Sequence, residues 1–208
     1  MARSLKREFW NAPNGVTLAR IGMIPVILLF TYYESRINSF IAALLYALTS
    51  ATDFLDGWLA RRMGLVTVIG KLLDPLADKL VVISALVMLV HLGRVAAWVV
   101  VLIMAREFII TGLRTIAATE GIVIPASQEG KYKTGLQLAG ICFLLLHYRY
   151  PIDFVVFATE LDANAAGTLL LYLSVFFSLW SAWRYFADFI RAVYRSEGEG
   201  GEGPGPRD

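Results

Sequence analysis

Residues 38–92 read NSFIAALLYALTSATDFLDGWLARRMGLVTVIGKLLDPLADKLVVISALVMLVHL. Two apolar runs, 38–60 and 71–92, flank a short polar segment, and each is long enough for a helix that crosses a bilayer, which needs about 20 residues. Aspartates stand in both runs at the ends that face this segment, although an ionisable group inside a span costs free energy. The stretch therefore predicts two membrane-spanning helices joined by a short loop, with acids gathered at one membrane surface.

The rest of the chain repeats this apolar pattern. Four more runs of similar length surround the pair, at 16–33, 95–117, 133–150 and 165–190. The 208 residues are 57% hydrophobic and only 17% charged, whereas a soluble domain holds about a quarter charged residues and a disordered chain even more. The composition excludes both classes and predicts an all-α integral membrane protein with six transmembrane helices.

Cationic residues are unevenly distributed over the two sides of this predicted bundle. The short loops on one side hold Arg36, Arg94 and Arg149, while the other Lys and Arg residues lie at the opposite ends of the spans or in the termini. Positive charge accumulates on the cytoplasmic side of membrane proteins. We therefore expect both termini to be cytoplasmic.

The two ends of the chain differ from the spans. In residues 1–12, leucine and aromatic residues lie beside Lys and Arg, which predicts a short interfacial segment on the cytoplasmic leaflet; a cleaved signal peptide is the alternative, but it would show a cleavage site and lack five further spans. Residues 196–208 are rich in Gly, Glu and Pro, which predicts a disordered tail. Residues 13–195 remain as the six-helix transmembrane domain that would carry catalysis.

Scarce residue types restrict the chemistry. The single cysteine, Cys142, excludes an internal disulfide and a multi-cysteine metal site. The two histidines, His91 and His147, fall near the predicted non-cytoplasmic ends, away from the acids. A formal net charge of +2 is too small to indicate a nucleic-acid partner.

The four aspartates of the opening stretch are spaced to converge. Asp53 and Asp56 are three residues apart, and Asp74 and Asp78 are four apart, so that each pair shares one face of its helix. Four carboxylates in a place of low dielectric constant repel one another unless countercharge is present. All-oxygen ligation suits Mg²⁺ or Mn²⁺, and two such ions would clamp a phosphate group. A structural ion-pair network or a proton relay is the other interpretation.

Written with its spacing, the segment is Asp53-x2-Asp56-Gly57-x2-Ala60-Arg61-x8-Gly70-x3-Asp74-x3-Asp78. This pattern resembles the signature of the CDP-alcohol phosphatidyltransferases at every specified position. The resemblance implies that the four aspartates bind two divalent cations, which hold the diphosphate of a CDP-linked lipid, and that Asp78 also acts as the general base. The residues that it places beside the nucleotide and the lipid are Asn14, Thr17, Gly57, Ala60, Arg61 and Gly70.

Three further blocks, 11–25, 105–114 and 130–134, resemble the bacterial phosphatidylglycerophosphate synthase branch of that family. The resemblance implies transfer of a phosphatidyl group from CDP-diacylglycerol to sn-glycerol 3-phosphate with release of CMP, at the cytoplasmic face of the bacterial inner membrane, by a homodimer. Arginine suits bidentate phosphate binding. The residues expected to hold the phosphate of the acceptor are Arg20, Arg106, Arg114, Lys131 and Lys133.

Two alternatives stay open at this point. The same metal site would serve another acceptor, namely inositol phosphate, phosphatidylglycerol or serine, although the cations favour a phosphorylated acceptor over serine. A small cation transporter would also hold acids in membrane helices, but those acids would be expected near the bilayer midplane. In this sequence the grouped acids lie at one face.

Overall fold

The computed structural model describes residues 12–63, 68–119, 129–153 and 158–200. Its elements are α2 (Ala12–Tyr32), α3 (Arg36–Met63), α4 (Val68–His91), α5 (Ala97–Thr119), α6 (Glu129–Leu146), β1 (Arg149–Asp153), β2 (Ala158–Asp162) and α7 (Ala163–Gly200). Each of the six expected helices is present and overlaps its predicted apolar run, because long apolar runs favour continuous helix. Pro25 and Pro75 lie inside α2 and α4 without ending them, which membrane helices tolerate. Residues 1–11 of the predicted interfacial segment and the last eight residues of the predicted tail lie outside the described residues, whereas Ala12 begins α2 and residues 196–200 belong to α7.

Two helical stretches pass a test of length and hydropathy for crossing a membrane. Within the described residues these are Gly15–Tyr32 in α2 and Ala163–Tyr194 in α7. The mostly helical, apolar architecture is that of an all-α membrane protein. The number of six spans and the cytoplasmic location of both termini stay predictions.

A two-stranded antiparallel hairpin interrupts the all-helical pattern, and the sequence analysis did not predict it. β1 pairs with β2, with Tyr150 opposite Leu161. The aromatic and β-branched residues between 150 and 159 favour extended backbone, which explains the difference. Asp162 then begins α7: its Oδ1 accepts a hydrogen bond of 3.0 Å from the backbone amide of Ala165, as an N-cap residue does. This hydrogen bond lowers the pKa of Asp162.

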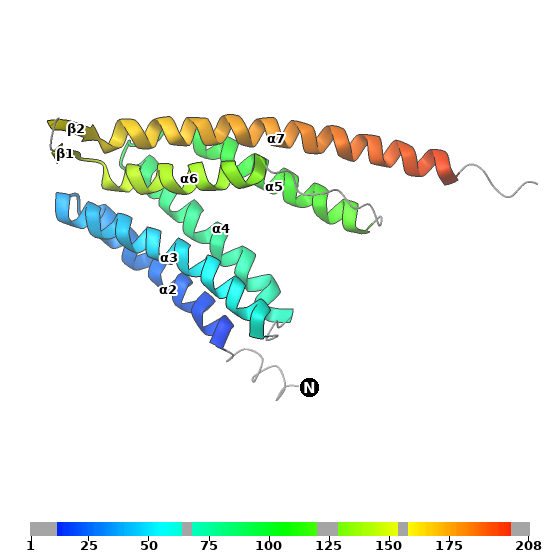
Figure 1. The fold of residues 1–208 in the computed structure, drawn as a ribbon, viewed down its shortest axis with the longest axis horizontal. Coiled ribbons are helices and arrows are strands. Elements are labelled where there is room, and N and C mark those ends of the chain that lie inside the picture. The colour runs from blue at the N-terminus through cyan, green and yellow to red at the C-terminus, as the bar shows by residue number, and fades with distance from the viewer. Residues whose placement is uncertain (1–11, 64–67, 120–128, 154–157, 201–208) are drawn as a thin grey trace, which may run out of the picture.

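The helices form two groups that meet at one end of the molecule and diverge at the other (Figure 1). In one group α2 packs against α3 and α4, in the other α7 packs against α6 and α5, and α3 also contacts α6. We call the end that holds β1 and β2 the hairpin end. The opposite end, where α2, α4 and α6 begin and α3, α5 and α7 finish, is called the open end.

The core joins the two groups. Its largest fully buried side chains come from α3, α4, α6 and α7, and they include Tyr46, Leu86, Leu89, Ile141, Leu144, Leu145 and Leu171. Arg94, in the turn between α4 and α5, is buried at the hairpin end. It donates hydrogen bonds to the Leu144 carbonyl oxygen at 3.2 Å and to a carboxylate oxygen of Glu34 at 3.0 Å. One buried cation thus ties the α2–α3 turn to the end of α6.

Two glycines bring the backbones of α6 and α7 into contact. A Cβ atom added to Gly167 would lie 2.7 Å from the backbone nitrogen of Leu144 and 2.9 Å from the carbonyl oxygen of Gly140. Real Cβ contacts are not that short, and backbone atoms cannot move aside as a side chain would. The small residues therefore permit a close helix–helix approach of the kind seen in membrane bundles.

We expect Gly167→Ala to lower the free energy of unfolding by about 1–3 kcal/mol, the usual cost of forcing an extra methyl group into a packed contact. The matched control is Gly135→Ala in α6, where a Cβ would meet nothing within 4 Å. Unfolding by SDS titration in mixed micelles, followed by circular dichroism, would measure both variants. Equal stability of the two variants would contradict the close-contact interpretation.

Candidate functional site

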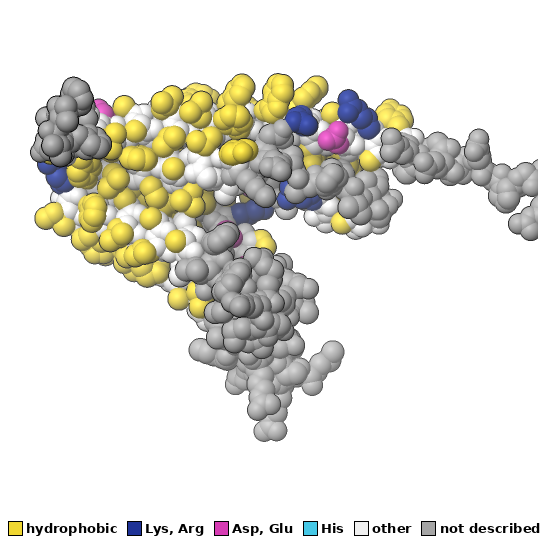
Figure 2. Space-filling model, in the orientation of Figure 1, with side chains coloured by type: hydrophobic (Ala, Val, Ile, Leu, Met, Phe, Trp, Pro, Cys, Tyr) yellow, Lys and Arg dark blue, Asp and Glu magenta, His cyan; other side chains and the backbone are white. Residues whose placement is uncertain are grey.

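A cavity of about 170 Å³ lies among α3, α4, α5 and α6. Its lining residues are Tyr46, Asp78, Lys79, Val82, Ile83, Leu86, Ile103, Met104, Glu107, Phe108, Lys133, Thr134, Gln137 and Leu138. On α4 and α6 the charged lining residues stand nearer the open end than the apolar ones, and on α5 Glu107 stands nearer that end than Ile103 and Met104. Figure 2 shows the same feature from outside: acidic and basic side chains gather in the notch between the two helix groups, and the flanking surface is mostly hydrophobic. The cavity can therefore hold a molecule with a charged head and an apolar body.

Asp74 and Asp78 lie one turn apart on α4 and face α2. The Thr17 hydroxyl donates a hydrogen bond of 2.6 Å to Asp74 Oδ1. Arg20 Nη1 lies 2.5 Å from Asp78 Oδ1. The side chains of Thr17 and Arg20 are buried, one turn apart on α2, so that a short stretch of α2 fixes both carboxylates of α4.

The remaining residues of the motif lie at the same end, but only their backbone is described. Asp53, Asp56, Gly57, Ala60 and Arg61 belong to the last turns of α3. Gly70 lies in the first turn of α4. The side chains of these residues, and those of Asn14 in α2 and Lys131 in α6, lie outside the described part of the structure.

The metal prediction falls partly on those side chains. Among the side chains that the structure describes, no group of three or more His, Cys, Asp or Glu residues could hold a metal ion. Asp74 and Asp78 offer only oxygen donors on one helix face, and this donor chemistry fits a hard divalent cation. The two-metal site stays a prediction.

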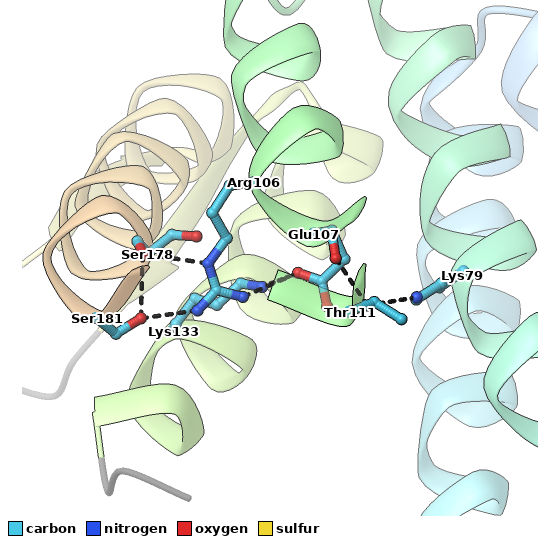
Figure 3. Close-up of polar contacts among 7 residues, drawn as sticks. All are labelled: Lys79, Arg106, Glu107, Thr111, Lys133, Ser178 and Ser181. Atoms are coloured by element: carbon cyan, nitrogen blue, oxygen red, sulfur yellow. Dashed lines mark hydrogen bonds and ion pairs between the residues drawn. The ribbon is translucent and has the colours of Figure 1, made fainter. Parts of the chain in front are cut away.

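Glu107 is the centre of a charged cluster at the polar end of the cavity (Figure 3). Its Oε2 accepts hydrogen bonds from Arg106 Nη1 at 3.1 Å and from the ammonium group of Lys133. The Lys133 side chain is only 7% exposed and that of Arg106 12%, whereas that of Glu107 is 37% exposed. The carboxylate thus neutralises two desolvated cations while one side of it stays accessible.

Arg106 itself is held by α7. Its Nε donates to the Ser178 carbonyl oxygen at 3.2 Å, and its Nη2 donates to the Ser181 hydroxyl at 2.7 Å. It is not among the described residues that line the cavity. The structure therefore places Arg106 behind Glu107, as the link between α5 and α7 (Figure 3).

Lys79 bridges the cluster to α4. Its Nζ donates a hydrogen bond of 3.0 Å to the Thr111 hydroxyl, which in turn donates to the Glu107 carbonyl oxygen at 2.7 Å. The Lys79 ammonium group also lies 5.9 Å from the centre of the Phe108 ring, within the range of a cation–π contact. Polar contacts thus run continuously from α7 to α4 at the level of Glu107.

The predicted acceptor-phosphate residues divide into separate places. Lys133 lines the cavity, Arg20 contacts Asp78, and the guanidinium group of Arg114 lies 5.7 Å from the Tyr185 ring centre. Neither Glu107 nor Lys79 was among the residues predicted from the sequence to form the site. The available signal for both was their charge inside an apolar run, but which neighbour each one meets depends on helix packing.

Comparison with known proteins places the chain in a family. The family model described as CDP-alcohol phosphatidyltransferase matches residues 10–180. The CDP-diacylglycerol–glycerol-3-phosphate 3-phosphatidyltransferase of Bacillus subtilis (strain 168) is 40% identical over 199 residues, which cover 90% of this chain and 99% of that protein. The protein of the same name from Rickettsia bellii (strain RML369-C) is 38% identical over 176 residues, covering 85% and 93%.

A third relative carries a related name. The probable phosphatidylglycerophosphate synthase of Mycobacterium tuberculosis (strain ATCC 25618 / H37Rv) is 41% identical over 145 residues, which cover 68% of this chain and 69% of that protein. The family match includes every residue of the aspartate motif and every predicted acceptor residue. The chain therefore belongs to the CDP-alcohol phosphatidyltransferase family and is a transferase of that type.

Proposed function

We propose that the chain transfers the phosphatidyl group of CDP-diacylglycerol to sn-glycerol 3-phosphate, giving phosphatidylglycerophosphate and CMP. The observation that carries this proposal is the cavity, which is charged at the open end and apolar towards the hairpin end. A lipid with a charged diphosphate head matches that polarity. The names of the relatives from Bacillus subtilis and Rickettsia bellii specify the same donor and acceptor.

The cations at the polar end of the cavity favour an acceptor that carries a phosphate group. Lys133 and Lys79 both line the cavity, and such groups attract a phosphorylated acceptor. Serine carries no phosphate group and would leave these cations without a ligand. Inositol phosphate is the alternative acceptor that the same cations would accommodate, and an acceptor panel with CDP-diacylglycerol in detergent separates the two.

Asp53, Asp56, Asp74 and Asp78 would hold two divalent cations, Mg²⁺ or Mn²⁺. Asp74 and Asp78 fit this role because both carboxylates face α2 from one side of α4, with Thr17 and Arg20 fixing their orientation. The chemistry that bound cations supply is neutralisation of the diphosphate and of the departing CMP.

The residues of the chain account for the proton and for substrate orientation. The acceptor hydroxyl attacks the phosphorus atom that carries diacylglycerol, and the bond from that phosphorus to CMP breaks. Asp78, which lines the cavity and is oriented by Arg20, takes the hydroxyl proton. Lys133 binds the phosphate of the acceptor, and the apolar wall around Leu86 holds the body of the lipid.

The membrane location of the proposed reaction is inferred from the helices, from the cations and from the resemblance to the bacterial phosphatidylglycerophosphate synthases. The apolar helices indicate a membrane protein, and we infer that the open end faces the cytoplasm of a bacterium, where glycerol 3-phosphate and CMP are dissolved. The excess of cations at the predicted cytoplasmic side supports this orientation. A homodimer is expected from the family resemblance alone.

We expect Asp78→Asn to abolish transfer while binding of CDP-diacylglycerol survives, because an amide can orient like the carboxylate but cannot take the proton. CMP release and equilibrium binding of the lipid in detergent would measure the two properties. Glu160→Gln, at an exposed acid of β2, is the control and should behave like the wild type. Near-normal turnover by Asp78→Asn would contradict the base assignment.

Lys133→Met should raise the KM for glycerol 3-phosphate about tenfold or more, the loss expected for a hydrogen bond to a charged group. The KM for CDP-diacylglycerol should change less than about twofold, since the lipid phosphates lie with the aspartates. Arg191→Met removes an exposed cation of α7 outside the cavity and should change neither constant. Equal rises in the KM values for glycerol 3-phosphate and for CDP-diacylglycerol would contradict the assignment of Lys133 to the acceptor phosphate.

Chelation with EDTA should abolish CMP release, and added Mg²⁺ or Mn²⁺ should restore it, because the four carboxylates then regain their countercharge. Circular dichroism of the chelated protein should keep its helical signal, which separates loss of the metal from unfolding. Full activity after exhaustive chelation would contradict the metal requirement.

A further inference from the structure

Glu107 is an acid at the place where the proposed function needs cations. It lines the cavity beside Lys133 and Lys79, where a carboxylate repels the phosphate of an acceptor and weakens its binding. Loss of this acid would therefore strengthen the attraction for a dianion. Neutralisation of Lys133 and Arg106 engages only one of its two oxygens, and the other oxygen is left for a second task.

The geometry of Glu107 divides its two oxygens between different tasks. Oε2 accepts hydrogen bonds from both Arg106 and Lys133. Within the described part of the chain, no donor reaches Oε1. The side chain is 37% exposed and lines the cavity, so that a ligand inside the cavity can reach this second oxygen. A carboxylate oxygen accepts hydrogen bonds only, so that the ligand group which it would bind is a hydrogen-bond donor, and the donors of the proposed acceptor are its hydroxyls.

The proposed acceptor carries two hydroxyls. Its primary hydroxyl becomes part of the new phosphodiester and must lie near Asp78. The secondary hydroxyl, on the middle carbon, takes no part in bond formation. Asp78 from α4 and Glu107 from α5 line the same cavity, which gives each hydroxyl a carboxylate on a different helix.

We propose that Glu107 is a specificity-determining residue whose free carboxylate oxygen accepts a hydrogen bond from the secondary hydroxyl of glycerol 3-phosphate. Arg106, anchored by Ser178 and Ser181 on α7, is then a positioning residue that fixes the Glu107 carboxylate. The assignment rests on the proposed function and refines it. It predicts that an acceptor with the middle hydroxyl is preferred over one without it, because the hydroxyl would replace water on a half-buried charged group.

The test compares glycerol 3-phosphate with 3-hydroxypropyl phosphate, which lacks only the middle hydroxyl. For the wild type we expect kcat/KM to be about 10- to 100-fold higher with glycerol 3-phosphate, the usual range for a hydrogen bond to a charged group. In Glu107→Ala this ratio should fall to about one. If Glu107 serves only to neutralise Lys133 and Arg106, the substitution lowers both activities equally and the ratio stays high, which overturns the proposal.

Glu160→Gln is the control, because it removes an exposed carboxylate that does not line the cavity; both its activities and their ratio should stay at the wild-type values. The ratio for the wild type is measured without any variant. Even if Glu107→Ala fails to fold, equal use of the two acceptors by the wild type would therefore refute the proposal. Transfer to inositol phosphate, but to neither glycerol 3-phosphate nor 3-hydroxypropyl phosphate, would overturn the proposed function as well. Equal use of glycerol 3-phosphate and 3-hydroxypropyl phosphate would overturn only the role of Glu107.

Discussion

A charge inside an apolar helix bundle must be paired, and this constraint organises the described structure at both ends. Desolvation of an unpaired ion costs several kcal/mol, so that each deeply buried cation is found against an acid or a carbonyl group. At the hairpin end Arg94 meets Glu34 and the last carbonyl oxygens of α6. At the open end the same requirement joins Arg106, Glu107 and Lys133. The first cluster closes the bundle, whereas the second leaves one oxygen of Glu107 and the cation of Lys133 at the cavity.

The division of the molecule into a tight end and an open end follows from packing. Gly140 and Gly167 let the backbones of α6 and α7 touch, and the buried side chains around Tyr46 and Leu144 join the two helix groups. Away from this core the helices diverge (Figure 1). The proposed reaction would require such an opening, because a lipid and a small phosphate would enter from different phases, and the packed hairpin end fixes the helices that line the cavity.

Part of the site could be predicted from local sequence. The spacing of Asp74 and Asp78 requires only a regular helix to place both on one face, and their common orientation towards α2 is observed. Arg106 was expected, from the family resemblance, to hold the acceptor phosphate. Its hydrogen bonds to Ser178 and Ser181 on α7 could not be predicted from the sequence. Ser178 and Ser181 gave no signal of their own because small polar residues are ordinary at helix contacts in membranes. The hairpin was missed because a short ribbon between long apolar runs leaves little periodic pattern.

Local sequence was enough to predict the helical runs, the uneven distribution of cations and the position of the aspartates at the facing ends of α3 and α4. These properties depend on hydropathy and on the helical repeat, both of which are local. The tertiary structure decided which cations reach the cavity, which acid neutralises them and how the two helix groups diverge. Those features depend on how each helix is rotated and how closely it meets its neighbours, and that is set by contacts between residues far apart in the chain, such as Arg106 with Ser181 and Gly140 with Gly167.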